Sequence, residues 1–205
     1  MRISLRLLVL SAVCALGAQA GDTLTQSDRD FAMSNLHATR KVFLDSVAGL
    51  TAEQWSFKPA PDRWSIAECA EHIALSEDLI AGRAKAILSS PAEPDKVVRG
   101  NEARATDQKI LDAVVDRSHK GQAPEPLQPK HKFATPKDAV EHFRESRDAN
   151  IDYVEKTQDD LRAHSAKGPT GQSLDAYQWL LLMSAHTERH TKQIEEVKAD
   201  PNYPK

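Results

Sequence analysis

The sequence of 205 residues contains only two cysteines, Cys14 and Cys69, and Cys14 lies in an N-terminal segment that we expect to be removed. A mature chain with one cysteine cannot form an intrachain disulfide, so its fold must depend on an apolar core or on a metal ion. The chain also lacks a block of basic residues, since 27 Lys and Arg stand against 30 Asp and Glu, for a formal net charge of −3. This balance argues against a protein that binds nucleic acid or an anionic membrane surface.

Residues 1–20 have the features of an export signal. Arg2 and Arg6 form a basic start, residues 7–16 form an apolar run too short to span a bilayer, and residues 18–20 read Ala-Gln-Ala, a small-x-small cleavage site. We therefore expect a cleaved signal peptide and an exported protein, periplasmic or secreted, with no stable membrane association after cleavage. Cleavage would change the net charge from −3 to −5, because it removes two basic residues and no acidic one. The alternative is an uncleaved anchor or a wrong start codon.

No alternation of apolar and polar residues indicates a β-strand, and apolar residues instead recur with helical spacing in four long stretches. Ser65 and Glu68 form a capping box at the start of the second stretch, and Pro136 stands where the first turn of a helix tolerates proline. The expected helices are residues 27–49 with Ser27 as the cap, residues 65–89, a helix that begins at Pro136, and residues 174–199 with Ser173 as the cap.

Two proline-containing segments connect these helices. Residues 51–64 hold two prolines, which prevent a continuous helix. Trp55 and Trp64 in this segment are expected to pack over the end of the core, or alternatively to form an aromatic lid over a ligand pocket. Residues 90–135 contain five prolines. We expect one short helix near residues 110–115, because long loops without structure are uncommon in compact domains.

Four amphipathic helices with a long connection in the middle predict an all-α fold. The expected architecture is a four-helix bundle with a long crossover between helices 2 and 3, formed by residues 21–205 after the signal peptide. A turn region, residues 164–173, precedes the last helix. Bundles of this kind often pair along a helix face, so a homodimer stays open as an expectation.

His186 and His190 lie four residues apart, which places both imidazoles on one face of the last helix. That face is otherwise apolar apart from Gln193, so it should point into the core. Two inward imidazoles are either half of a metal site or neutral core residues that are hydrogen-bonded to the backbone or to each other. His72 lies within the apolar side of the second helix and is the best third ligand. Three histidines would leave a position open for water or substrate, as in catalytic metal sites.

Arg147 falls unexpectedly on the apolar stripe of the helix that begins at Pro136. Long cationic side chains often cover apolar surface, so Arg147 is expected to extend to the end of the bundle. The alternative is a guanidinium that binds an anionic substrate or orients a ligand. Gln193 is likewise a candidate for contact with the ligands or with a substrate. Neither Arg147 nor Gln193 is a general base, and the sequence offers no clear one.

Known catalytic motifs are absent. A zinc-protease helix needs Glu directly after the first histidine or directly before the second, and Thr187 and Arg189 occupy these places. The chain also lacks the G-x-S-x-G motif, the phosphate-binding P-loop and the dinucleotide fingerprint. The histidine pair therefore does not indicate a known class of metalloprotease.

Two longer motifs stand in a fixed order: W-S-I-x-E-x-x-x-H over residues 64–72 and H-x-x-x-H-x-x-Q-I over residues 186–194. With Trp55-x-Phe57-x-Pro59 before them, they resemble the DinB/YfiT-like superfamily over about residues 27–199. The resemblance implies a four-helix bundle with a divalent metal ion, zinc or nickel, on three histidines, which map to His72, His186 and His190. Many members are regarded as metal-dependent hydrolases, and others are transferases or isomerases that use small thiols.

Three functions follow as hypotheses. The first is an exported metal-dependent hydrolase that uses water activated at the three-histidine site and acts on an unknown small molecule. The second is a thiol-dependent transferase of the same superfamily, which the export signal disfavours because small thiols are scarce outside the cytoplasm. The third is a non-catalytic exported binding or stress protein that the metal stabilises.

Overall fold

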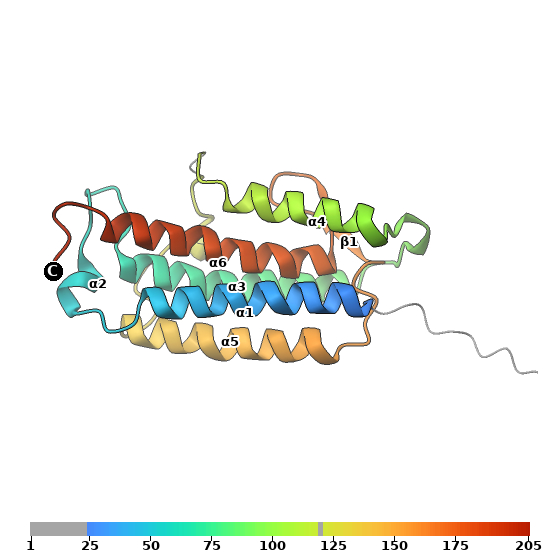
Figure 1. Ribbon diagram of the computed structural model, residues 1–205, viewed down its shortest axis with the longest axis horizontal. Helices are drawn as coiled ribbons and strands as arrows, with labels where there is room; N and C mark the ends of the chain where they lie inside the picture. Colours follow the sequence, from blue (N-terminus) through green and yellow to red (C-terminus); the bar gives the residue numbers. More distant parts are fainter. Residues whose placement is uncertain (1–23, 119–120) are drawn as a thin grey trace, which may run out of the picture.

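The computed structural model describes residues 24–118 and 121–205, so the expected signal peptide lies outside the described residues. The α-helices of the described part are α1 (Gln26–Ser46), α2 (Ala52–Ser56), α3 (Ile66–Ile87), α4 (Gly100–Val115), α5 (Pro136–Lys156) and α6 (Ala176–Lys198). Two short 3-10 helices, η1 (Pro94–Lys96) and η2 (Glu125–Leu127), and two strands, β1 (Ser165–Lys167) and β2 (Ser173–Asp175), complete it (Figure 1). None of these described helices combines the length and apolar character needed to cross a bilayer.

Four long helices, α1, α3, α5 and α6, form a bundle. α3 packs against α5 and α6, and α1 packs against the same two helices. α1 and α6 run in one direction and α3 and α5 in the other (Figure 1). Because α3 and α5 are parallel, the chain must return along the bundle between them. Residues 88–135 form this connection, which is the expected crossover.

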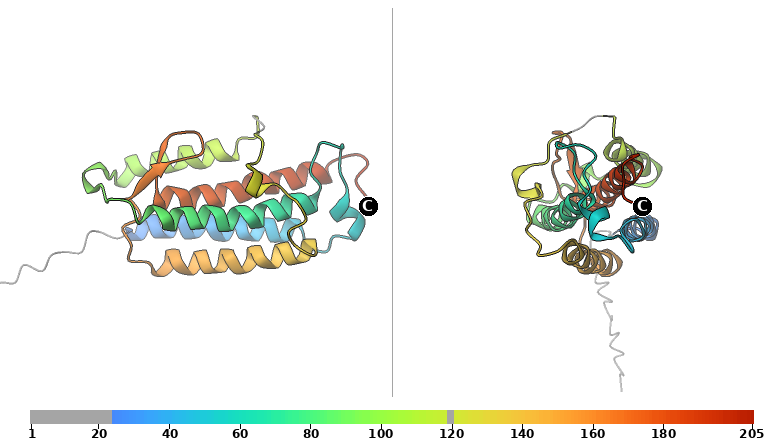
Figure 2. Two further views of the ribbon diagram at one scale, coloured as in Figure 1. Left: turned by 180° about the vertical axis from the view of Figure 1, so that it is seen from behind. Right: turned by 90° about the vertical axis from the view of Figure 1, so that its left-hand side faces the viewer.

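The crossover contains a longer helix than residues 110–115. α4 has 16 residues and packs against α6 on the outside of the bundle (Figure 2). Its buried residues Ala103, Asp107 and Leu111 lie four apart on one face. The sequence prediction was too short because a charged residue interrupts this stripe. Asp107 is nevertheless buried, since Arg162 donates to both of its carboxylate oxygens at 2.9 and 2.7 Å.

The observed helix starts match those predicted from the sequence at α3 and α5, and they differ from the predicted starts at α1 and α6. Ser65 and Glu68 form the expected capping box of α3. Thr25, not Ser27, caps α1. The expected turn region before α6 is a short antiparallel hairpin, and its last residue, Asp175, caps α6 in place of Ser173. Strands of three residues are too short for an alternating pattern to reveal them.

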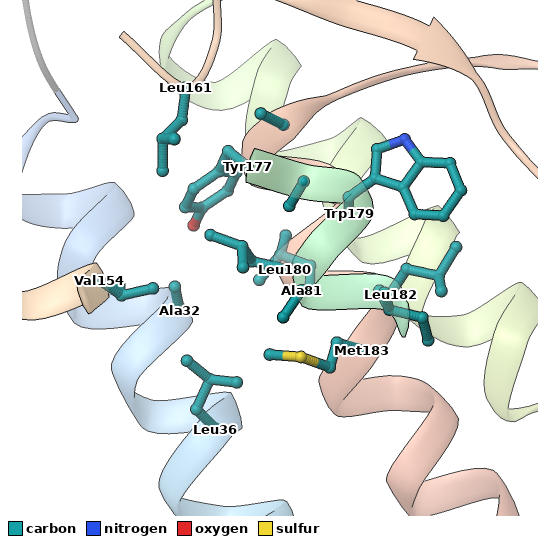
Figure 3. Close-up of a cluster of buried hydrophobic side chains, with 14 of the residues drawn as sticks. Ala32, Leu36, Ala81, Val154, Leu161, Tyr177, Trp179, Leu180, Leu182 and Met183 are labelled. Carbon is teal, nitrogen blue, oxygen red and sulfur yellow. The ribbon is translucent and has the colours of Figure 1, made fainter. Parts of the chain in front are cut away.

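Apolar side chains from all four bundle helices fill the interior. Figure 3 shows Leu36 of α1, Ala81 of α3, Val154 of α5 and Met183 of α6 within one such cluster. A second apolar cluster, which includes Trp55, lies toward the end of the bundle that holds α2. Each long helix contributes polar residues between the two clusters, so a buried polar layer divides the core.

Arg147 lies in this polar layer. Its Nε and Nη2 groups donate to the two carboxylate oxygens of Glu77 at 2.7 and 2.8 Å, and both side chains are 0% exposed. The other N–H groups donate to the carbonyl of Leu36 and to the hydroxyls of Thr39 and Thr187. The expectation that Arg147 extends to the end of the bundle is therefore wrong, and so is a direct contact with an anionic substrate, whereas the alternative that Arg147 orients a ligand stays a prediction. The side chain does not reach the end of the bundle, and its five donors are all used inside the protein, so none is left for a substrate.

Candidate metal centre

Three histidines from two helices meet between α3 and α6. Nε2 of His72 lies 3.2 Å from Nε2 of His186 and 3.1 Å from Nε2 of His190. The three possible ligand nitrogens all lie within 4.8 Å of one another. The four-residue spacing on α6 brings His186 and His190 together, and the antiparallel packing of α3 on α6 adds His72. The structure thus places together the three histidines that the sequence singled out.

The environment of the three rings keeps them neutral. His72 and His190 are buried and His186 is half-buried. Burial, with a smaller contribution from the charges of His72 and Arg189, lowers the pKa of His186 to about 3. Burial also lowers the pKa of His72, and burial and the two neighbouring histidines hold the pKa of His190 well below its usual value. Neutral imidazole is the form that binds a metal ion.

Hydrogen bonds from the far side of two rings determine which nitrogen carries the proton. Nδ1–H of His72 donates to the carbonyl oxygen of Leu127 at 2.7 Å. Nδ1 of His190 lies 3.0 Å from Oε1 of Gln193, and Arg117 Nη1 donates to the same atom at 3.3 Å. Because arginine can only donate, that atom is the amide oxygen, and His190 Nδ1 must carry hydrogen. The Nε2 atoms of His72 and His190 therefore present lone pairs to each other.

This arrangement fits a cation better than a set of neutral core residues. Two lone pairs 3.1 Å apart repel unless a positive charge lies between them, and the pair His72–His190 has no ring N–H to share. Nitrogen ligands about 2.0–2.1 Å from a tetrahedral zinc ion are about 3.3 Å apart, close to the spacing of these nitrogens. The donor set is therefore suited to a divalent ion.

A cavity of about 600 Å³ opens onto the three histidines. Trp64 lines it, with its ring 4.9 Å from the ring of His72 and 6.1 Å from that of His190. Trp64 thus borders a pocket, as the alternative interpretation of residues 51–64 expected, whereas Trp55 packs in the core. The cavity gives a small molecule access to the Nε2 atoms.

Glu71 of α3 anchors residues 130–132, which directly follow the cavity-lining residues 127–129. Its buried carboxylate accepts the backbone N–H groups of residues 130–132 at 2.9, 3.1 and 3.0 Å. His131 has a φ of 57°, and such a left-handed residue lets successive N–H groups face one anion. This anchor holds the segment whose Leu127 carbonyl accepts from His72. The sequence did not reveal this anchor, because Glu71 bonds to backbone N–H groups, which are the same whatever the side chain of the residue that carries them.

Comparison with known proteins gives consistent matches. The sequence model of the DinB superfamily matches residues 35–194. The Uncharacterized protein YuaE of Bacillus subtilis (strain 168) is 23% identical over 166 residues, which are 81% of this chain and 96% of that protein. The solved structure of YfiT from Bacillus subtilis, described as "a probable metal-dependent hydrolase with an unusual four-helix bundle topology", has a TM-score of 0.58 at 14% identity. The match covers 89% of this chain and 93% of YfiT, and at this identity it shows a shared fold.

Proposed function

The chain belongs to the DinB superfamily, and on this premise we propose that it is a metal-dependent hydrolase whose metal ion is held by His72, His186 and His190. The observation that carries the proposal is the convergence of three neutral imidazoles on one point beside a cavity. The description of YfiT, which shares the fold, agrees with it. Zinc or nickel suits this nitrogen donor set, because imidazole is a good ligand for both. We also propose export, on the basis of the signal pattern in residues 1–20.

A divalent ion at this site would supply Lewis acidity and lower the pKa of a water ligand toward neutrality. The chain's own residues hold the rings and shape the cavity. Leu127 and Gln193 fix the orientation of His72 and His190. Among the described residues that line the cavity, the carboxylates are Asp62 and Glu68. Glu68 is engaged by the cap of α3 and by Lys58, so Asp62 is the lining carboxylate that stays available for contact with a bound substrate.

Turnover by metal-loaded protein tests the proposal. We expect the zinc or nickel form to hydrolyse members of a panel of carboxylic esters, phosphate esters and amides. Metal-stripped protein and the His186→Ala variant should be slower by about 10²-fold or more, the effect of losing a major electrostatic stabiliser. Turnover that requires a small thiol would instead identify a transferase. A zinc-dependent rise in Tm with no turnover of any probe would identify a non-catalytic protein.

Glu71→Gln is expected to weaken zinc binding about tenfold or more while the protein stays folded. An amide offers one acceptor oxygen and no charge, so it cannot hold all of the N–H groups of residues 130–132, and the Leu127 carbonyl is then free to leave His72. Groups that orient metal ligands typically contribute about 10–100-fold to affinity. Competition with a chelator measures the affinity, and circular dichroism checks the helices.

The matched control for this substitution is Glu141→Gln, which removes an exposed carboxylate on α5 that pairs only with Arg144 in the described part of the chain. Its zinc affinity should equal that of the unmodified protein. If Glu71→Gln folds normally and binds zinc as tightly as this control, the anchor has no role in holding His72.

A further inference from the structure

The cavity above the histidines is more basic than the chain as a whole. The charged residues of its lining are Lys58, Arg63, Arg117 and Arg189 against Asp62 and Glu68. The entire chain, in contrast, has a formal net charge of −3. An acidic protein that gathers basic side chains around one cavity creates a local positive potential there, which attracts anions.

The basic residues differ in how firmly the protein holds them. Arg117 donates from Nε and Nη2 to both oxygens of Glu196 at 2.7 and 2.8 Å and from Nη1 to Gln193. Arg63 also reaches Glu196, but through one long hydrogen bond of 3.4 Å. Two guanidinium groups thus share one carboxylate. Arg63 makes no other side-chain hydrogen bond to residues of the described chain, so most of its donors stay available.

Arg63 and Lys58 lie on the same connection between α2 and α3, at the cavity. The side chain of Arg63 is 32% exposed, and that of Lys58 is 39% exposed and contacts Glu68 at 3.0 Å. Arg63 directly precedes Trp64, whose ring borders His72 and His190. Because Arg63 and Trp64 both line the cavity, one molecule bound in it can contact the indole ring and the guanidinium group together. The planar guanidinium matches the two oxygens of a carboxylate or a phosphate.

We infer that the substrate is a small organic anion whose carboxylate or phosphate group binds Arg63, with Lys58 nearby, and whose apolar part packs on Trp64. The inference rests on the proposed function only in taking this cavity as the place where the substrate binds. Arg63 would select substrates by their negative charge, a role that the metal ligands do not have.

Benzoate and benzamide test this inference, because they have nearly the same shape and differ in charge. Their binding is followed through the indole N–H signals in NMR spectra of zinc-loaded and metal-free protein. We expect both forms to bind benzoate about tenfold more tightly than benzamide, a ratio that corresponds to one charge-assisted contact. Arg63→Gln should remove this preference in the metal-free form and leave zinc affinity unchanged.

Arg144→Gln is the matched control, since Arg144 is an exposed arginine of α5 outside the cavity lining, and it should bind benzoate normally. Equal affinities for the two probes, no detectable binding of benzoate, or unchanged benzoate affinity in Arg63→Gln would overturn the inference. Benzoate binding that needs zinc but not Arg63 would overturn it too. If zinc does not bind but Arg63-dependent benzoate binding persists, the anion site stands and the hydrolase proposal fails.

Discussion

His72→Ala is expected to reduce bound divalent metal from about one equivalent to less than about a tenth of an equivalent, because two imidazoles on one helix cannot complete the site. His186 and His190 would still face the cavity, but the ligand from α3 would be gone. Elemental analysis of protein purified without a chelator measures the content. In the unmodified protein, zinc at about 100 times its Kd should stabilise the fold by about 2.7 kcal/mol, and this stabilisation should vanish in the variant.

His142→Ala is the control for this experiment. His142 is a half-buried histidine on α5 that pairs with Asp78 and lies outside the candidate centre. It should retain the full equivalent of metal, which separates the loss of one of the three converging ligands from the loss of any other histidine. A full equivalent of zinc on His72→Ala would show that the ion is bound elsewhere, and the proposed centre would be wrong.

The sequence predicted the bundle well where local signals and burial agree. At α3, the Ser65–Glu68 capping box fixes the helix start, and the apolar residues that follow at helical spacing are buried in the core. The prediction failed at α4, whose buried face carries Asp107. A pattern that scores apolar residues cannot recognise a carboxylate that is buried only because Arg162, 55 positions later, neutralises it.

The candidate site was predictable to the same limited extent. The spacing of His186 and His190 and the apolar surroundings of His72 were enough to name the three histidines. The groups that orient them were not, apart from Gln193, because they depend on contacts across the fold. Glu71 acts through the backbone of residues 130–132, and Arg117 follows α4 in the crossover, so neither belongs to a motif near the ligands.

The second large effect is expected in the polar layer, where Arg147→Leu should lower the free energy of unfolding by about 3–5 kcal/mol, the usual result of breaking a buried ion pair. The variant leaves the Glu77 carboxylate without its counter-charge at a position that is 0% exposed. The hydroxyls of Thr39 and Thr187 lose a donor as well. Urea unfolding of the metal-free protein, followed by circular dichroism, measures the change without a contribution from bound zinc.

Arg144→Leu controls for the loss of an arginine from the same helix. The pair Arg144–Glu141 is exposed, so its removal should change the free energy of unfolding by less than about 1 kcal/mol. The double variant Glu77→Leu with Arg147→Leu should be more stable than Arg147→Leu alone, because it removes the unpaired carboxylate together with its partner. If Arg147→Leu were as mild as Arg144→Leu, water would have to reach Glu77, and the layer would not be the closed ion-pair network that its burial indicates. Because Thr187 directly follows His186 and Glu77 lies on α3 with His72, the zinc affinity of Arg147→Leu also reports whether this layer holds the ligands of α6 in register with His72.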